Sequence, residues 1–476
     1  METAILEAKQ TQVNVIKIFE AQKTNQQSVK NCTIEERKGK LRKLKSAIEV
    51  REQDILEALK KDLRKSVFES SVMELYFIYG EIDFAIKNLS TWTKPQKVSS
   101  NLMNLMTKCR MIYESKGVSL IIAPWNYPFQ LLIAPLISAI AAGNCCILKP
   151  SELAPATSRI LSKLIKETFK ENEIAIVEGD ASVAGELLAL PFDHIFFTGS
   201  TNIGKVVMAA ASKHLTSVTL ELGGKSPTII DEHADLKKAA AKIAWGKFAN
   251  AGQTCIAPDY VFIHESQQEK FIDLLKKNIE KSYFNNGQLN KEDYGKIISD
   301  NHFNRLQNMV NDAVKKGAQI KAGGTFEESD RTIYPTILTN VSQDSSVMKE
   351  EIFGPILPIL TYKNMNEVIA YVNSHNKPLA LYVFSNDKQK IDNILKQTSS
   401  GGACINDVII HISNPNLSFG GVNTSGVGGS HGFHGFKAFS HERSVMYQST
   451  LFDSTNIIYP PYNGKEKILK LIKKMS

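Results

Sequence analysis

The 476-residue sequence predicts an α/β protein with two α/β domains, the first of them doubly wound, and a small additional β element. Its length exceeds what one hydrophobic core supports, so at least two domains are expected. Short apolar strands alternate with helical segments along most of the chain, which is typical of parallel sheets covered by helices. Residues 117–148 contain no charged residue, as expected for the buried first strand–helix–strand unit of such a sheet.

This uncharged stretch resembles a membrane span only at first sight. Three prolines and three amides interrupt it: Pro124, Pro128, Pro135, Asn126, Gln130 and Asn144. Prolines and amides at that density argue against a lipid-exposed helix, so no membrane span is expected. We predict instead a strand at 118–123, a loop, a buried helix at about 129–142 and a strand at 145–148.

The elements follow one another in two series. Residues up to about 88 are expected to be helical, with apolar residues at helical spacing over 35–63. The first series of strands is predicted at 112–123, 145–148, 174–178, 194–197 and 218–220, with helices such as 156–169 between them. The second series has strands at 226–230, 259–263, 319–321, 332–338, 355–360 and 380–384, and helices at 235–248, from 267 and near 366. Each series predicts one α/β domain.

The remaining segments differ in kind. From Gly401 the chain is rich in Gly, Ser, Asn and His, and we expect it to lie over a surface or another subunit. Residues 90–108 are predicted to form a small sheet with this tail. The division that follows is 1–89 with 109–220, then 221–400, then 90–108 with 401–450, and a C-terminal tail at 451–476.

Composition excludes several functional classes. The net charge of +8 is spread along the chain without an aromatic-interleaved basic block, so no nucleic-acid partner is expected. The six cysteines are sparse and the chain begins with polar residues, which favours a reducing cytoplasm over a secreted disulfide protein. No metal is expected: there is no CxxC pair, and His431 and His434 favour packing over ligation. The basic end, 465–474, could touch an anionic membrane surface, although a solvated chain end is favoured.

Three polar residues could carry chemistry on a carbonyl group. Cys255, in NAGQTCI, supplies a thiol, the common side chain that is nucleophilic near neutral pH. Glu221, in TLELGGKSP, supplies a base, and Asn126, in APWNYP, supplies an amide donor for an oxyanion. Each has an ordinary structural alternative: a buried core thiol, a strand-end acid and a turn cap.

A phosphate site is predicted after the strand at 194–197. Gly199, Ser200 and Gly204 form a glycine turn that opens a helix and presents free N–H groups to an anion. The turn departs from GxGxxG, so a plain strand–helix turn stays an alternative. Lys149 and Glu152 follow another strand at its carboxyl end, where a doubly wound sheet binds its ligand.

Seven segments in order give these residues a common context: APWNYP, LKPSELAP, FTGSTNIGK, LELGGKSP, NAGQTC, EEIFGP and LSFGGVNTSGVG. With them the chain resembles the aldehyde dehydrogenase superfamily over nearly its whole length. The tail, with SHGFHGFKAFSHERSV, resembles the class 3 branch of short, typically dimeric enzymes. The resemblance implies a Rossmann-type cofactor domain (1–89 and 109–220), an α/β catalytic domain (221–400) and a small β oligomerisation element.

The resemblance also implies an NAD(P)-dependent oxidation of an aldehyde to an acid. Cys255 would form a thiohemiacetal and then a thioester, Asn126 and the Cys255 N–H would hold the oxyanion, and Glu221 would activate water. The implied cofactor residues are Lys149, Glu152, Gly199, Ser200, Gly204, Leu222, Glu351 and Phe353. Glu152 favours NAD, with NADP possible because Lys149 could offset its charge.

Substrate and assembly follow from the same resemblance. Tyr127, Trp245 and Phe248 could line an apolar channel for a medium- or long-chain aliphatic or an aromatic aldehyde, or be plain core. A homodimer is expected. Two other functions stay open: a coenzyme A-acylating enzyme, which should lack the base at Glu221, and a catalytically silent binding protein on the same scaffold.

Overall fold

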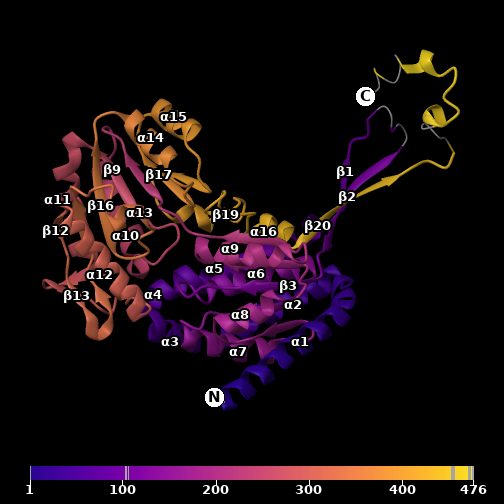
Figure 1. Cartoon of the computed structure of the whole chain (residues 1–476), viewed down its shortest axis with the longest axis horizontal. Coiled ribbons are helices and arrows are strands. Elements are labelled where there is room, and N and C mark those ends of the chain that lie inside the picture. Colours follow the sequence, from indigo (N-terminus) through magenta and orange to yellow (C-terminus); the bar gives the residue numbers. More distant parts are fainter. Residues whose placement is uncertain (1, 102–103, 105–106, 452–455, 470–472, 474–476) are drawn as a thin grey trace.

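The computed structural model describes residues 2–101, 104, 107–451, 456–469 and 473 (Figure 1). Within them the chain forms a six-stranded sheet, a seven-stranded sheet and a three-stranded sheet, with two short two-stranded ribbons. Two of the sheets carry helices and form the two halves of the body, and the third projects from it as an arm (Figure 1). The predicted two α/β domains with a small β element are therefore present.

The N-terminal region is helical, as predicted. Its helices are α1 (Glu2–Lys30), α2 (Ile34–Val50), α3 (Glu52–Leu63), α4 (Val67–Ser70), the π-helical turn η1 (Ser71–Leu75) and α5 (Tyr76–Trp92). Thr33 begins α2 with a capping box, in which its backbone N–H donates to Glu36 Oε2 at 2.7 Å. The amphipathic run predicted over 35–63 is not one helix, because the chain changes direction at Arg51, whose ψ is 14°.

The six-stranded sheet has the order β19-β7-β6-β3-β4-β5. Its strands are β3 (Val118–Ile122), β4 (Cys145–Lys149), β5 (Ile174–Ile176), β6 (His194–Thr198), β7 (Ser217–Glu221) and β19 (Gly426–Val427). All are parallel except β19. The order of the parallel strands is that of a dinucleotide-binding fold, which places the topological switch point between β3 and β6. The helices between them are α6 (Gln130–Ala142), α7 (Pro155–Thr168), α8 (Ala181–Leu188) and α9 (Thr201–Ser212).

The single strand predicted over 112–123 is in fact two strands. β2 (Lys108–Ser115) belongs to the arm and β3 begins at Val118. Gly117 lies between them with φ 129°, and a Cβ there would lie 2.2 Å from Asp193 Oδ2. A glycine is needed at this turn because only it combines that backbone angle with the missing side chain. The turn moves the chain from one sheet to another.

The seven-stranded sheet has the order β12-β15-β16-β9-β8-β17-β18, with β12 antiparallel and the rest parallel. Its strands are β8 (Pro227–Ile230), β9 (Tyr260–His264), β12 (Gln319–Ala322), β15 (Thr336–Thr339), β16 (Ile356–Tyr362), β17 (Ala380–Phe384) and β18 (Gly402–Ile405). Its helices are α10 (Leu236–Phe248), α11 (Gln268–Tyr283), α12 (Asp300–Lys315), α13 (Ser346–Lys349), α14 (Met365–Ser374) and α15 (Lys388–Gln397). The ribbons are β10 (Phe284–Asn285) with β11 (Gln288–Leu289), and β13 (Phe326–Glu327) with β14 (Thr332–Ile333).

A short connection joins the two large sheets. Residues 222–226 run directly from the carboxyl end of β7 to the amino end of β8. The carboxyl edge of the six-stranded sheet therefore faces the amino edge of the seven-stranded sheet. A side chain at either of these two edges therefore lies in the junction between the two domains.

The arm has the order β1-β2-β20, where β1 is Gln96–Val98 and β20 is Ser440–Tyr447 (Figure 1). It confirms that part of 90–108 forms a sheet with the tail. The rest of 401–450 differs from its predicted place in one oligomerisation element, because β18 extends the seven-stranded sheet and β19 the six-stranded sheet. The helix α16 (Gly432–Ala438) packs on α5 and α6. The tail thus passes from one domain to the other, and its glycines allow close backbone contacts along the way. The composition of the tail did not predict this path.

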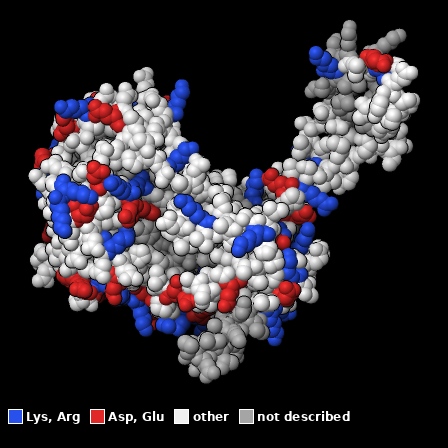
Figure 2. Space-filling view, viewed as in Figure 1, with Lys and Arg blue, Asp and Glu red and all other residues white. Residues whose placement is uncertain are grey.

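The face shown in Figure 2 carries no field of one sign. On the face in Figure 2, Lys and Arg are interspersed with Asp and Glu. No helix among the residues that the structure describes is long and apolar enough to cross a membrane. In the predicted basic helix at 465–474, a short 3₁₀ turn covers Glu466–Ile468, and residues 470–472 and 474 lie outside the described residues.

Candidate active site

The predicted catalytic residues meet at the junction of the two sheets. Asn126 follows β3, and Glu221 ends β7, both at the carboxyl edge of the six-stranded sheet. Cys255 precedes β9 and Glu351 precedes β16, both at the amino edge of the seven-stranded sheet. Two separate halves of the chain thus contribute to one site, with Asn126 next to the topological switch point where such sheets bind ligands.

A strained coil presents Cys255. Asn250 and Ala251 both have φ 51° and Gly252 has φ 74°. A Cβ at Gly252 would lie 2.4 Å from the carbonyl oxygen of Gly354, so only glycine fits there. Fully buried Gln253 fixes the coil: its side chain donates to the carbonyl oxygens of Asn250 and Lys296 at 3.0 Å and accepts from the Ile298 N–H at 3.0 Å. Left-handed backbone at non-glycine residues costs about 1–3 kcal/mol each and is typical of functional sites.

The APWNYP segment is bonded to this coil. Asn126 Nδ2 donates to the carbonyl oxygen of Gln253 at 3.1 Å, and Tyr127 Oη lies 2.8 Å from Thr254 Oγ1. Both partners directly precede Cys255. An amide nitrogen carries two hydrogens, so one N–H of Asn126 is held by this bond and the second remains for an oxyanion. The structure thus brings Asn126 and Cys255 together.

A buried ion pair supports the same segment, and sequence reasoning missed it. Lys65 is fully buried and its Nζ donates to Glu74 Oε1 at 2.7 Å and to the carbonyl oxygen of Asn126 at 2.8 Å. Glu74 Oε2 accepts from the N–H groups of Phe129 and Gln130, at the start of α6. These additional hydrogen bonds offset the desolvation cost of the buried pair. Because they reach the backbone of residues 126, 129 and 130, they also hold the loop before α6 in place. No sequence signal separated these residues from the other charges of the N-terminal helices.

Glu221 is a buried carboxylate, with 4% of its surface exposed. Ser430 Oγ donates to Glu221 Oε1. Burial raises the pKa of Glu221 to about 7, although the hydrogen bond from Ser430 opposes the shift. Such a pKa suits a general base at neutral pH. Ser430 lies beyond the segments that pointed to the site, and only the fold places it there.

Cys255 is half-buried in a carboxylate-rich environment. Burial, and then the charges of Glu351 and Glu221, raise the pKa of the Cys255 thiol. Burial and the charge of Asp259 likewise raise the pKa of Glu351 to about 8. The thiol is therefore held in its protonated form, and its activation requires a proton acceptor beside it.

Six of the predicted cofactor residues end or follow strands of the six-stranded sheet at its carboxyl edge: Lys149, Glu152, Gly199, Ser200, Gly204 and Leu222. Lys149, 3% exposed at the end of β4, donates to Glu152 Oε2 at 3.1 Å. Ser200 caps α9 after β6, which directs N–H groups of the helix toward the edge. A Cβ at Gly204 would lie 2.7 Å from Leu222, so this glycine lets α9 approach β7 closely. These features fit a phosphate-bearing ligand.

The EEIFGP turn faces them across the junction. A Cβ at Gly223 would lie 2.2 Å from Glu351 Oε2, so the carboxylate lies directly on the connection between the sheets. Arg305 donates to the carbonyl oxygens of Glu351 and Ile352 at 3.2 and 2.7 Å and fixes the turn. The ring of Phe353, whose φ is 49°, packs edge-on against Trp125 at 5.3 Å. Glu351 and Phe353 thus face the segment that carries Asn126.

The three aromatic residues predicted to line a channel differ in their surroundings. Tyr127 is buried beside Thr254, next to Cys255, and Trp245 is 40% exposed on α10. Phe248 is fully buried in the core of the seven-stranded domain, where its ring packs edge-on against Tyr283. This burial fits the core alternative for Phe248, which lies one helical turn from Trp245 on the core side of α10.

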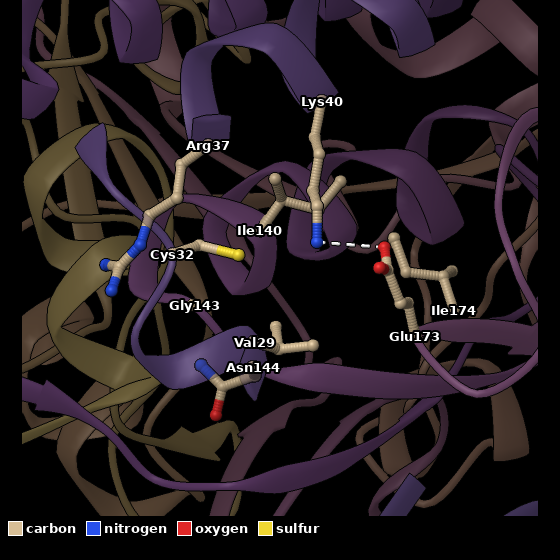
Figure 3. Close-up of a pocket in the computed structure, with 9 residues that line it drawn as sticks. All are labelled: Val29, Cys32, Arg37, Lys40, Ile140, Gly143, Asn144, Glu173 and Ile174. Carbon is tan, nitrogen blue, oxygen red and sulfur yellow. Dashed lines mark ion pairs between the residues drawn. The ribbon is translucent and has the colours of Figure 1, made fainter. Parts of the chain in front are cut away.

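A separate pocket lies at the other end of the six-stranded sheet (Figure 3). Gly143 and Asn144 precede β4 and Glu173 precedes β5, so it opens at the amino ends of these strands. An ion pair of 2.8 Å between Lys40 and Glu173 crosses it (Figure 3). None of the predicted site residues lines this pocket, and it does not belong to the site.

Comparison with known proteins agrees with this geometry. The model of the aldehyde dehydrogenase family matches residues 2–445. The chain is similar to a putative aldehyde dehydrogenase AldX of Bacillus subtilis, with 49% identity over 93% of this chain and 99% of the relative. It is also similar to the 4,4'-diaponeurosporen-aldehyde dehydrogenase of Staphylococcus aureus, with 47% identity over 94% and 96% of the two chains. Aldehyde dehydrogenase family 3 member A2 of Mus musculus is 45% identical over 90% of this chain and 87% of the relative.

Solved structures give the same result. The substrate-bound state of Staphylococcus aureus AldH has a TM-score of 0.92 and 45% identity, covering 96% of this chain and 99% of that chain. A betaine aldehyde dehydrogenase of Staphylococcus aureus in complex with NAD⁺ has a TM-score of 0.83 at 26% identity over 93% and 91% of the chains. A glyceraldehyde-3-phosphate dehydrogenase GapN of Methanocaldococcus jannaschii in complex with NADP has a TM-score of 0.82 at 26% identity over 92% and 95%.

Proposed function

The chain belongs to the aldehyde dehydrogenase family and oxidises an aldehyde to a carboxylic acid with NAD(P), and from this premise we propose that Cys255, Glu221 and Asn126 perform the chemistry. Cys255 gives its thiol proton to a neighbouring carboxylate, and its Sγ adds as the thiolate to the carbonyl carbon. The free N–H of Asn126 and the Cys255 backbone N–H donate to the oxyanion that forms. Glu221 then takes a proton from water, which attacks the thioester on Cys255.

Bound NAD(P) would supply the acceptor for the hydride that leaves the substrate carbon. Eight residues of this chain are proposed to hold it: Lys149, Glu152, Gly199, Ser200, Gly204, Leu222, Glu351 and Phe353. Their support is their position at the two facing edges and the close approaches that Gly204 and Gly223 allow. The preference for NAD over NADP stays a prediction from the charge of Glu152.

The observation that carries the hydrolytic step is the burial of Glu221 beside Cys255, which gives the carboxylate a pKa of about 7. An enzyme that passes its thioester to coenzyme A has no need for such a base. We therefore expect formation of reduced cofactor and free acid without coenzyme A. Turnover that requires coenzyme A would instead favour the acylating reaction.

We propose a medium- or long-chain apolar aldehyde as the substrate. A relative is named as a 4,4'-diaponeurosporen-aldehyde dehydrogenase, and Trp245 presents exposed apolar surface on α10. Each buried methylene is worth about 0.8 kcal/mol, so kcat/KM is expected to rise about fourfold per added methylene until the channel is filled. Reduced-cofactor absorbance with a series of aliphatic aldehydes measures this slope.

Trp245→Ala is expected to flatten that slope, while Tyr462→Ala, which removes an exposed aromatic ring from the C-terminal tail, leaves it unchanged. A kcat/KM that falls with chain length in the unmodified protein would contradict the apolar substrate. An unchanged slope in Trp245→Ala would remove this residue from the channel.

We propose that the chain forms a homodimer through the arm. The arm has only three strands, and most side chains of β1 and β20 are exposed in the single chain. A sheet this small needs a second surface to be stable. Val98, Met446 and Tyr447 are 49%, 53% and 51% exposed and would supply apolar contacts.

Met446→Glu is expected to shift the protein from dimer to monomer, because it places a charge in that contact. Sedimentation equilibrium measures the molar mass of the variant and of the unmodified protein. Val314→Glu, at a 43% exposed position on α12, is the matched control and should leave the dimer intact. A monomer in the unmodified protein would exclude the proposal.

We further propose that the chain works in a reducing cytoplasm. All six cysteines are free thiols. Oxidation of Cys255 would remove the proposed nucleophile, so the site requires a compartment that keeps thiols reduced. Loss of activity on mild oxidation and its recovery with a dithiol would support this proposal. Full activity under oxidising conditions would contradict it.

A further inference from the structure

A small pocket lies beside Glu221. Thr198, Glu221, Ser430 and His431 line it together with apolar residues of α6 and Phe196. Within the described residues, Thr198 Oγ1 is buried without a hydrogen-bond partner. This hydroxyl, the Glu221 carboxylate and the Ser430 hydroxyl supply the two to four polar partners that a bound water needs.

His431 is held in place at a conformational cost. It has φ 69° and ψ 141°, an unfavourable region for a residue with a side chain, and it is 5% exposed. Phe77 and Phe419 pack edge-on against its ring, at centroid distances of 5.2 and 5.4 Å. Burial lowers the pKa of His431 to about 4, so its ring is neutral at pH 7. A neutral imidazole has one nitrogen that donates and one that accepts.

A second buried carboxylate lies on the other side of this ring. His431 Nδ1 is 3.9 Å from Glu81 Oε1, beyond hydrogen-bond distance but within reach of a small ring movement. Glu81 Oε2 accepts from the Gly432 N–H at 3.2 Å. Glu81 is 7% exposed, and burial raises its pKa, which makes its carboxylate a better proton acceptor. The two carboxylates are thus separated by one pocket and one imidazole.

The proposed hydrolytic step leaves a proton on Glu221, and that carboxylate is 4% exposed. The proton must leave before Glu221 can act again. We propose that His431 is a positioning residue for the release of this proton. It takes up the proton of Glu221 through a water in the pocket and passes it to Glu81. This inference rests on the proposed role of Glu221 as the base.

Each transfer exchanges one O–H or N–H bond for another. Protonated Glu221 gives its proton to the pocket water, which gives one of its own to His431 Nε2. His431 Nδ1, the nitrogen that faces Glu81, releases its proton to Glu81, and Glu81 returns it to solvent. Glu221 regains its carboxylate form, and no electron or further reactant is needed.

His431→Leu tests the proposal because it keeps an apolar side chain between the phenylalanines and removes both nitrogens. The initial burst of reduced cofactor is expected to keep its rate and amplitude, since the burst precedes hydrolysis. The steady-state rate should fall about tenfold, less than the loss of roughly 100-fold or more that follows from removing a general base. The solvent deuterium effect on the steady-state rate should increase.

His411→Leu is the matched control. Both ring nitrogens of His411 are also buried without a partner in the described part of the chain, and its ring lies 6.2 Å from Phe419. It does not line the pocket beside Glu221. We expect a normal steady-state rate and a normal deuterium effect in this variant. Equal losses in both histidine variants would show a packing effect and overturn the proposal.

Glu81→Gln removes the final acceptor and keeps an oxygen for the Gly432 N–H, so it tests the relay even if His431→Leu does not fold. The same selective loss of steady-state rate is expected. A normal rate in both Glu81→Gln and His431→Leu overturns the relay, and so does an equal loss of burst and steady state. Full turnover in Glu221→Gln would show that Glu221 is not the base. A loss of turnover in Glu221→Gln together with normal rates in the other two variants would show that only the relay is wrong.

Discussion

Cys255→Ala is expected to lower kcat/KM for aldehyde oxidation by roughly 10⁴-fold or more, because it removes the thiol that forms the proposed covalent intermediate. The thiol precedes β9 at the amino edge of the seven-stranded sheet, and strained backbone at Asn250 and Ala251 supports its position. Alanine at position 255 removes the sulfur without disturbing that coil. The measurement is reduced-cofactor absorbance with an aliphatic aldehyde, in the burst and in the steady state.

Two variants separate the loss of a nucleophile from the loss of packing. Cys404→Ala removes another partly buried thiol that packs against the same core, and it should keep full activity. Cys255→Ser keeps the shape but supplies a weaker nucleophile, so both burst and steady state should be strongly reduced. Activity of Cys255→Ala near that of the unmodified protein would make Cys255 a structural thiol.

Glu221→Gln is expected to form reduced cofactor in a single turnover and then stall. Its steady-state rate should be lower than that of the unmodified protein by roughly 100-fold or more. The thioester still forms on Cys255, but no base activates the water that removes it. Glutamine keeps the size of the side chain and an oxygen for Ser430. Rapid mixing followed by absorbance separates the burst from the steady state.

The pH profile of the unmodified protein checks the same assignment. The pKa of Glu221 is about 7, so its base form is lost as pH falls through that value. The hydrolysis-limited rate should then decrease about tenfold per pH unit below pH 7. In Glu221→Gln this limb should be absent. A steady rate in the variant that equals the rate of the unmodified protein would assign water activation to another group.

Burial of the Glu221 carboxylate should also lower the free energy of unfolding at pH values above its pKa. Raising a carboxyl pKa from 4.5 to about 7 makes the folded state bind the proton more tightly than the unfolded chain does. The folded state is therefore favoured below pH 4.5 and loses that advantage as pH rises through 7, by about 3 kcal/mol. Glu221→Gln should raise the free energy of unfolding above about pH 8 and change it little near pH 4.

Much of the fold followed from local pattern. The strands at β4, β6, β7, β8, β9 and β17 lie where apolar runs bounded by turn residues predicted them, because fully buried parallel strands require such runs. Boundaries failed where long-range contacts decide the conformation. The break at Gly117 depends on Asp193, and the helix predicted over 35–63 turns at Arg51.

The candidate site was predictable in its residues and not in its arrangement. Cys255, Glu221 and Asn126 stand in recognisable segments, and the structure brings all three to one junction. Lys65 gave no such signal, and Ser430 and His431 stand in the quoted tail segment without a predicted role at the site, because their importance comes from buried contacts with partners far along the chain. Phe248 shows the opposite case, a residue near the motif that the helix turns toward the core.

The sequence by itself determined the family, the two α/β series and the chemical groups of the site, because strand patterns and motifs are local properties of the chain. The tertiary structure alone decided that the carboxyl edge of one sheet meets the amino edge of the other. It also decided that burial raises the pKa of Glu221 to about 7. Burial and edge-to-edge packing depend on contacts between residues that are distant in sequence, so no local segment determines them.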